Sequence, residues 1–301
     1  MDVMWTGSDP VANFFLFTSY GKHTVVAEGS YAHCSKVYEV NIQMQSISYN
    51  FDEAITKINS AVLKKYSIDL ASSSIATEYK HVMHIFPPVP DNFASAGGNE
   101  SAYFAATPDV FPHELGHNLG FKHSNSFINE SGAPIAYDDI SDPMGYSGVG
   151  LRGYDSIHRD QMQWVASNLI TDPFAQGANG KTLTLLPLDF KPTDFNPASG
   201  YQILRFRQAG QVNTANYYYV SVRTNKDAAG KTSKYPTRDS YVGINIHLYS
   251  KTNESDTTGE SNFIARLQSP GASQTLKDGT TIKLTQVNAA SQAYTVVVSR
   301  P

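Results

Sequence analysis

The segment FPHELGHNLGFKH, residues 111–123, holds three of the nine histidines in this 301-residue chain. His113 and His117 are four residues apart, so in a helix their rings lie on one face, about one turn from each other. Gly120 permits the positive φ at which a helix ends and the chain turns back, which brings His123 round to the same point. The spacing therefore predicts a metal site built from three imidazoles.

The types of residue in this segment predict which metal it binds. Three neutral imidazoles with a fourth position open to water are the ligand set of a catalytic Zn²⁺ ion, whereas structural zinc sites are usually closed by four protein ligands. Glu114 lies beside the first ligand, near enough to act on a water as general base and then as general acid. Pro112 suits a first helical turn because its missing N–H needs no partner there. The accidental alternative, two surface histidines flanking a glutamate, leaves Gly120 and His123 unexplained.

The overall composition is that of a globular protein, with 41% hydrophobic and 17% charged residues. A net charge of −4 does not indicate a surface that binds nucleic acid. No apolar run approaches the roughly 20 residues of a membrane span. The N-terminus lacks a basic region followed by an apolar one, so the protein is either cytosolic or has lost a signal and any pro-segment. Abundant Tyr, Ser, Thr and Asn favour a secreted or cell-surface protein. We expect a monomer that acts on a protein or glycoprotein.

The two halves of the sequence differ in their hydrophobic pattern. Residues 1–170 mix helical and strand patterns and hold eight of the nine histidines, which predicts a catalytic domain. Residues 171–301 carry short β-branched and aromatic runs separated by turn residues, which predicts a β-sandwich domain. The expected fold class is α+β, a twisted sheet with an active-site helix followed by an all-β sandwich. The expected strands of the second half are 181–188, 201–208, 216–224, 241–249, 281–287 and 293–299.

Two elements stand out before the histidine segment. Residues 51–66 have apolar side chains every three or four positions, which is typical of an amphipathic helix. Residues 81–88 have the pattern of a strand that ends at prolines.

The segment YDDISDPMGYSG, residues 137–148, follows the histidines. An HExxHxxGxxH sequence followed by a methionine turn is the signature of the metzincin clan of zinc endopeptidases, which this sequence resembles. The resemblance implies that Met144 forms an apolar floor beneath the zinc ion. It also implies that Tyr146 stabilises the oxyanion of the tetrahedral intermediate; the alternative is a tyrosine packed in the loop wall.

Within the clan the sequence most resembles the gametolysin family. The resemblance covers most of the chain, but it is specific only over residues 113–123 and 142–146, and the family's first strand is short or absent in residues 1–20. It implies a zinc metalloendopeptidase that hydrolyses internal peptide bonds of extracellular or cell-surface proteins. The matching segments are TSYGK (18–22), Cys34, ELGHNLGFKHS (114–124), DPMGYSG (142–148), IHRDQMQW (157–164), YYYVSVRT (217–224) and YVGINIH (241–247).

The resemblance also makes predictions about the substrate. Metzincins have an edge strand before the active-site helix, and such an edge binds the backbone of an extended peptide. We expect residues 100–105 to form this edge. Arg152, in the loop over residues 145–155, is a candidate for recognising acidic or polar side chains of the substrate.

Other residues that could react or bind a metal are better explained by a structural role. Cys34 is the only cysteine, so no intramolecular disulfide forms, and a free thiol is favoured over a latency switch. His158 is expected to cap a helix over residues 156–165 rather than touch substrate, and His247 is expected to lie in a sheet. Ca²⁺ is a second cofactor candidate, with ordinary turn formation as the alternative, at Asp138, Asp139 and Asp142.

Two functions of other classes remain open. The first is a catalytically weak binding or adhesion protein on a protease scaffold, against which the intact Glu114 argues. The second is an exopeptidase or a hydrolase of non-peptide bonds. An exopeptidase needs a charged group that holds a substrate terminus, and the sequence shows no obvious candidate.

Overall fold

The structure, a computed structural model, combines a few helices with several β-sheets, which confirms the α+β class. Its contacts define two compact units, the first of Met1–Asn13 and Val25–Gly120 and the second of Phe14–Thr24 and Phe121–Pro301. Cys34 lies outside the described residues, so its predicted free thiol stays a prediction. The residues described are 11–25, 38–42, 51–72, 81–86, 94–104, 107–128, 130–146, 150–177, 179–210, 216–237, 239–251 and 258–301.

The first unit contains helix α2 (Phe51–Tyr66), a three-stranded sheet and helix α4 (Val110–Asn118). The bounds of α2 are those predicted from the sequence. Its buried side chains Ala54, Ile58 and Val62 follow one another at four-residue steps, as an amphipathic helix requires.

The sheet of the first unit has the order β1-β3-β2, with β1 (Val82–Ile85), β2 (Ala94–Gly97) and β3 (Glu100–Tyr103). β3 pairs in parallel with β1 and antiparallel with β2. The prediction that residues 100–105 form an edge strand is wrong for Glu100–Tyr103, because a strand lies on each side of β3, and residue 105 lies outside the described residues. α4 packs against β2 and β3, so this sheet supports the helix that carries the first two histidines.

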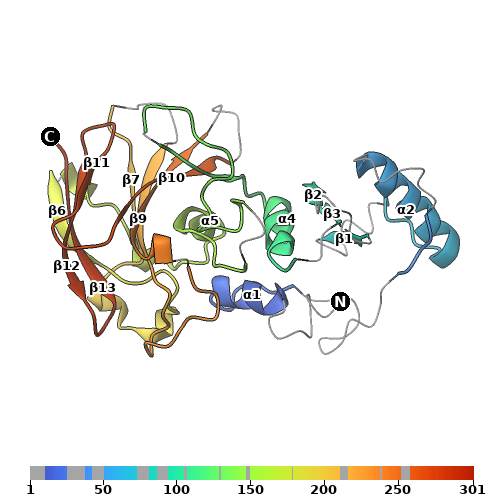
Figure 1. Cartoon of the computed structure of the whole chain (residues 1–301), viewed down its shortest axis with the longest axis horizontal. Helices are drawn as coiled ribbons and strands as arrows, with labels where there is room; N and C mark the ends of the chain where they lie inside the picture. Colours follow the sequence, from blue (N-terminus) through green and yellow to red (C-terminus); the bar gives the residue numbers. More distant parts are fainter. Residues whose placement is uncertain are drawn as a thin grey trace. The chain divides into compact units, whose positions relative to one another are not determined.

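The second unit is built on two sheets, whose strands β9, β10, β12 and β13 are seen together in Figure 1. The larger sheet has the order β4-β10-β9-β8-β7-β5; its outer strands β4 and β5 pair in parallel and the others antiparallel. Its strands are β4 (Ser124–Ser126), β5 (Ile170–Thr171), β7 (Ile203–Arg207), β8 (Tyr217–Arg223), β9 (Gly243–Ser250) and β10 (Glu260–Leu267). The smaller, antiparallel sheet has the order β11-β12-β13-β6, with β6 (Gly180–Leu185), β11 (Ser273–Thr275), β12 (Thr281–Asn288) and β13 (Ala293–Ser299).

Short helices complete the described chain. α1 (Val11–Thr18), which the sequence pattern did not predict, buries Phe14 and Phe15. α5 (Ser156–Gln161) contacts β8. Five 3₁₀ turns are η1 (Ser167–Leu169), η2 (Ala175–Gly177), η3 (Pro192–Asp194), η4 (Pro197–Ser199) and η5 (Asp239–Tyr241).

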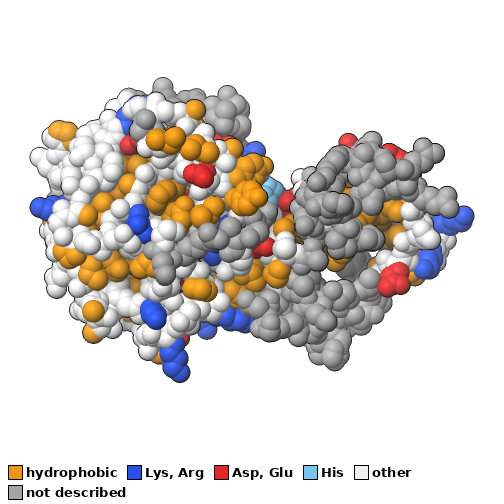
Figure 2. All heavy atoms as spheres, viewed as in Figure 1, with side chains coloured by type: hydrophobic (Ala, Val, Ile, Leu, Met, Phe, Trp, Pro, Cys, Tyr) orange, Lys and Arg blue, Asp and Glu red, His pale blue; other side chains and the backbone are white. Residues whose placement is uncertain are grey.

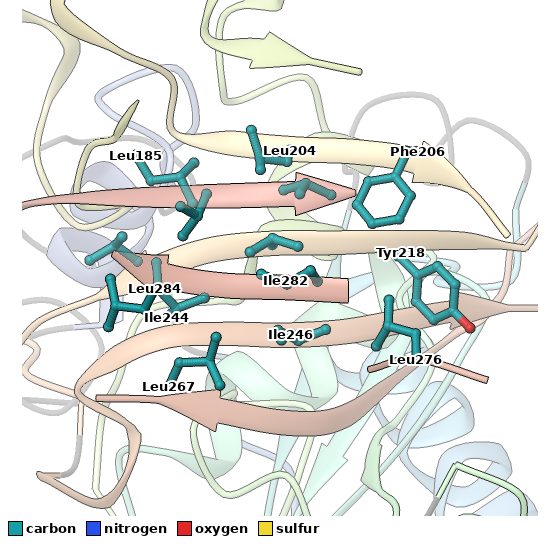
Figure 3. Close-up of a cluster of buried hydrophobic side chains, with 14 of the residues drawn as sticks. Leu185, Leu204, Phe206, Tyr218, Ile244, Ile246, Leu267, Leu276, Ile282 and Leu284 are labelled. Atoms are coloured by element: carbon teal, nitrogen blue, oxygen red, sulfur yellow. The ribbon is translucent and has the colours of Figure 1, made fainter. Parts of the chain in front are cut away.

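The two sheets of the second unit share one hydrophobic core. Their buried side chains point toward one another in Figure 3, because alternate residues of each strand face the same side. The larger sheet contributes Leu204, Phe206, Tyr218, Val220, Val222, Ile244, Ile246, Leu248 and Leu267, and the smaller sheet and its turns contribute Leu185, Leu276, Ile282, Leu284, Val296 and Val298.

All six strands expected in the second half are present, whereas β4, β5, β10 and β11 were not predicted. The larger sheet takes β4 from before residue 170 and most of its strands from after residue 171, so one sheet joins both sides of the predicted boundary. The division into a 1–170 catalytic domain and a 171–301 β-sandwich domain stays a prediction.

The described surface carries charges of both signs. Basic and acidic side chains are scattered singly among hydrophobic ones on the face shown in Figure 2. The most exposed large hydrophobic residues include Ile128 and Tyr146, which flank the segment between β4 and the methionine turn. Among the described residues, no helix combines the length and the apolar character needed to cross a bilayer.

Candidate metal centre

The first two histidines lie on α4. His113 is buried and His117 is half-buried, and their ring centroids are 4.9 Å apart with an angle of 85° between the ring planes. This confirms that the two rings share one face of a helix, as their spacing predicted. Pro112 lies in the first turn of α4, which begins at Val110.

The chain turns sharply after α4. Gly120 has a φ of +89°, and its N–H donates to the His117 carbonyl oxygen (2.9 Å). This positive φ confirms the predicted bend. It also explains the glycine, because residues with a side chain rarely adopt this conformation. One ring nitrogen from each of His113, His117 and His123 then lies within 4.8 Å of the other two. Because the three histidines belong to eleven consecutive residues, their convergence is a local property of one segment.

The backbone of the third histidine is fixed by the larger sheet. The carbonyl oxygen of His123 accepts a hydrogen bond from the N–H of Ser261 in β10 (3.3 Å). β4 begins at the next residue, Ser124, and pairs in parallel with β10. This pairing fixes the backbone that carries the third imidazole. The three imidazoles together are a set of nitrogen donors, which fits a metal ion that prefers nitrogen ligands, zinc among them.

Glu114 directly follows the first of these histidines and is buried. Burial raises the pKa of its carboxyl to about 8, because the charged form loses hydration, whereas a nearby cation acts in the opposite direction. Burial also raises the pKa of the Tyr103 phenol in β3, and the negative charge of Glu114 adds to this increase. The glutamate is thus held in a poorly hydrated environment beside the histidines.

Met144 is fully buried in a tight turn. Its N–H donates to Oδ1 of Asp142 (2.7 Å), and its carbonyl oxygen accepts from the N–H of Ser124 (3.0 Å), the residue after the third histidine. Gly145 is required in this turn, because a Cβ there would lie 2.0 Å from the carbonyl oxygen of Asp139. The methionine turn is therefore fixed at the end of the histidine segment, and a place for Met144 beneath a metal ion stays a prediction.

The loop after the turn departs from two expectations. Tyr146 is 64% exposed, which does not fit the alternative of a tyrosine packed in the loop wall. Arg152 is buried, and its guanidinium donates to the carbonyl oxygens of Asp142 (2.7 Å), Tyr146 (2.8 Å) and Gly150 (2.9 Å). The prediction that Arg152 recognises substrate side chains is wrong, because its guanidinium is buried and is bound to these three carbonyl oxygens.

Two further groups of side chains in the second unit have the proximity that a metal ion requires. Asp139, Asp155 and His247 form one group, and Asp142, Asp155 and His158 form the other, all of them buried. The Nε2 atom of His247 is 3.0 Å from Oδ2 of Asp139, and the Nδ1 atom of His158 is 3.2 Å from Oδ2 of Asp142. Asp155 lies between them, 3.4 Å from His158 and 3.9 Å from His247.

These carboxylates and imidazoles satisfy one another electrostatically. Burial lowers the pKa of His158, but the facing carboxylates of Asp142 and Asp155 outweigh it and raise the pKa to about 9. Burial raises the pKa of Asp142, but the positive charge on His158 outweighs it and the pKa is lowered. The pKa of His247 is raised in the same way, against the effect of burial, by its hydrogen bond to Asp139.

The same groups bear on three smaller predictions. His158 is fully buried inside α5, so a structural place is confirmed, but the prediction that it caps a helix over 156–165 is wrong, because α5 ends at Gln161 and its N-cap is Asp155. His247 lies in β9, as predicted. Asp139 and Asp142 face imidazole nitrogens, whereas Ca²⁺ takes oxygen ligands, and a calcium site at these residues stays a prediction. Sequence reasoning gave no role to Asp155, although an aspartate before a short helix is a normal N-cap signal.

The fold and the site define an α+β protein whose histidine and aspartate side chains are placed to hold a metal ion. No protein-family model matches this sequence, and no curated protein and no solved structure matches it either. The likeness to metzincins and to the gametolysin family thus rests on the motifs quoted above.

Proposed function

We propose that this protein is a secreted or cell-surface zinc metalloendopeptidase of the metzincin type, most similar to the gametolysin family. The observation that carries the proposal is the convergence of three imidazole nitrogens, from His113, His117 and His123, beside the buried carboxyl of Glu114. A zinc ion held by such a set lowers the pKa of a water ligand and polarises the carbonyl of a peptide bond.

The protein's own residues have separate roles in this proposal. The three histidines bind the metal through neutral imidazoles. Glu114 takes a proton from the attacking water and passes it to the leaving amine, and its poorly hydrated surroundings strengthen its interactions with charge that develops there. Met144 supplies an apolar floor, and the exposed Tyr146 donates a hydrogen bond to the oxyanion.

The second unit supports the site in the same proposal. Its two sheets form a β-sandwich around their shared core, and β10 of the larger sheet binds the backbone of His123 and pairs with β4. The sandwich therefore stabilises one ligand of the metal directly, in addition to any role in docking a glycoprotein.

A substitution of the glutamate tests the proposal. Glu114→Gln keeps the size of the side chain and removes the base, so we expect the rate of cleavage to fall by about 10²- to 10⁴-fold with zinc still bound. The substrate is an internally quenched peptide library blocked at both ends, which an exopeptidase cannot cleave. Zinc content is measured by elemental analysis on protein never exposed to a chelator.

The control is Glu53→Gln, an exposed glutamate of α2 that pairs with Lys57 (2.7 Å) and lies outside the site. It should leave cleavage unchanged. Cleavage by Glu114→Gln within a few fold of the wild type would overturn the mechanism. Wild-type protein that binds zinc and cleaves no peptide would support the alternative, a binding or adhesion protein on a protease scaffold.

A further inference from the structure

Tyr137 lies against the third histidine of the metal centre. The centroids of its ring and of the His123 imidazole are 4.0 Å apart, with 40° between the ring planes. This is contact distance for two aromatic rings, so the tyrosine limits the rotation of the imidazole. Both residues belong to the second unit.

The backbone of Tyr137 is in a conformation that residues with a side chain rarely adopt. Its φ is +60°, in the left-handed region. Bulky residues are found there when the surrounding structure holds them, and such positions gather at functional sites. A glycine or an asparagine would adopt this backbone conformation at lower cost. A tyrosine at this position therefore suggests that its side chain has a specific role.

Hydrogen bonds on both sides hold Tyr137 in this conformation. Its N–H donates to Oδ1 of Asn125 (3.1 Å), and its carbonyl oxygen accepts from the N–H of Tyr146 (2.7 Å). Asn125 in turn donates its side-chain amide to Glu260 (3.0 Å) and Asn262 (3.3 Å) of β10. The ring is thus connected through Asn125 to the same strand that binds the backbone of His123.

From this geometry we infer that Tyr137 is a positioning residue for the metal ligand His123: its ring, kept in place by a strained backbone, holds the imidazole in the orientation that the metal requires. The inference rests on the proposed metal centre, and it assigns the positioning to the aromatic ring, which is the group that contacts the imidazole. Hydrogen-bonded partners that orient metal-binding histidines typically contribute 10- to 100-fold to metal affinity, and we expect a ring contact to act within the same range.

The test separates the effect on the metal from the effect on the fold. Tyr137→Asn removes the ring and suits the left-handed backbone, so we expect zinc affinity to fall by about 10- to 100-fold while the stability of the metal-free protein stays equal or rises. Tyr137→Phe keeps the ring and should bind zinc within a few fold of the wild type. Zinc affinity is measured by competition with a chromophoric chelator, and stability by urea unfolding.

Ser67→Asn is the matched control. Ser67 has a φ of +58°, is exposed, and follows α2 in the first unit. This variant also places an asparagine at a position with left-handed backbone, but it lies outside the metal centre and should not change zinc affinity. Equal zinc affinity in Tyr137→Asn and the wild type overturns the inference, as does an equal loss in Tyr137→Phe and Tyr137→Asn. A wild-type protein that binds no zinc refutes the proposed function itself, which distinguishes the two failures.

Discussion

The histidine triad and the aspartate–histidine groups both place three potential ligands within reach of one metal ion, but they differ in chemistry. Every carboxylate of the two groups faces an imidazole, so negative and positive charges compensate without an ion. The triad offers one ring nitrogen from each of three imidazoles and includes no carboxylate. Neutral nitrogens of this kind are typical ligands of a metal cation. His117 and His123 are also partly exposed, whereas the aspartates and histidines of the groups are buried. Proximity alone therefore does not define a metal site; the donor types and an open side decide it.

Metal content gives the largest contrast between the two regions. His117→Ala removes one of the three proposed ligands and should lower bound zinc from one ion per chain to none, with complete loss of any cleavage. His247→Asn changes an aspartate–histidine group and should leave one zinc ion bound. Elemental analysis of both purified variants measures the difference. If His247→Asn loses the metal and His117→Ala keeps it, the assignment of the two regions is reversed.

Stability should show the opposite contrast. Asp155 accepts hydrogen bonds from the N–H of His158 (2.9 Å) and from Oγ of Ser261 (2.5 Å) inside the buried groups. Asp155→Ala leaves two buried donors without an acceptor and takes one of the two carboxylates away from each imidazole, so we expect a loss of about 3–5 kcal/mol in the free energy of unfolding. Asp172→Ala is the control, since exposed Asp172 accepts one backbone hydrogen bond from Phe174 (2.8 Å), which contributes about 1 kcal/mol. Equal losses in the two variants would contradict a buried charge network.

The pH dependence of stability sharpens the comparison further. The pKa of His158 is raised from its ordinary 6.5 to about 9, so the folded state binds a proton that the unfolded state releases between these values. The stability it contributes is complete below about pH 6.5 and is lost as pH rises through about 9, with a slope of at most about 1.4 kcal/mol per pH unit. Urea unfolding of chelator-treated protein between pH 6 and 10 measures this slope. His158→Gln should flatten it, and an unchanged slope would show that other groups are responsible.

The sequence predicted the parts of the molecule that depend on neighbours along the chain. The spacing of His113, His117 and Gly120 was enough for the helix, the bend and the triad, because each is a local matter of helical geometry. The apolar steps of α2 and the alternation of the C-terminal strands are local in the same sense.

Features that depend on distant partners were not predictable in this way. The middle position of β3 depends on which strands pair with it, and the sequence carries no sign of that order. The aspartate–histidine groups join the methionine turn, α5 and β9, segments that only folding brings together. Tyr137 was overlooked because neither its positive φ nor its contact with His123 has a sequence pattern.

The smallest expected effect concerns the open side of the triad. Tyr146 is 64% exposed, so water competes for its hydroxyl, and a hydrogen bond made only to the oxyanion contributes little more than one made in solvent. Tyr146→Phe should therefore lower kcat by about tenfold, equivalent to about 1.4 kcal/mol, while KM and zinc content stay unchanged. Steady-state kinetics on the blocked quenched peptide measures the split between kcat and KM. A change in KM alone would place the tyrosine in substrate binding, and no change in either constant would remove it from the mechanism. In both cases the oxyanion of the intermediate would have to be stabilised by the metal and by backbone N–H groups. Catalysis at the histidine triad would then not require Tyr146.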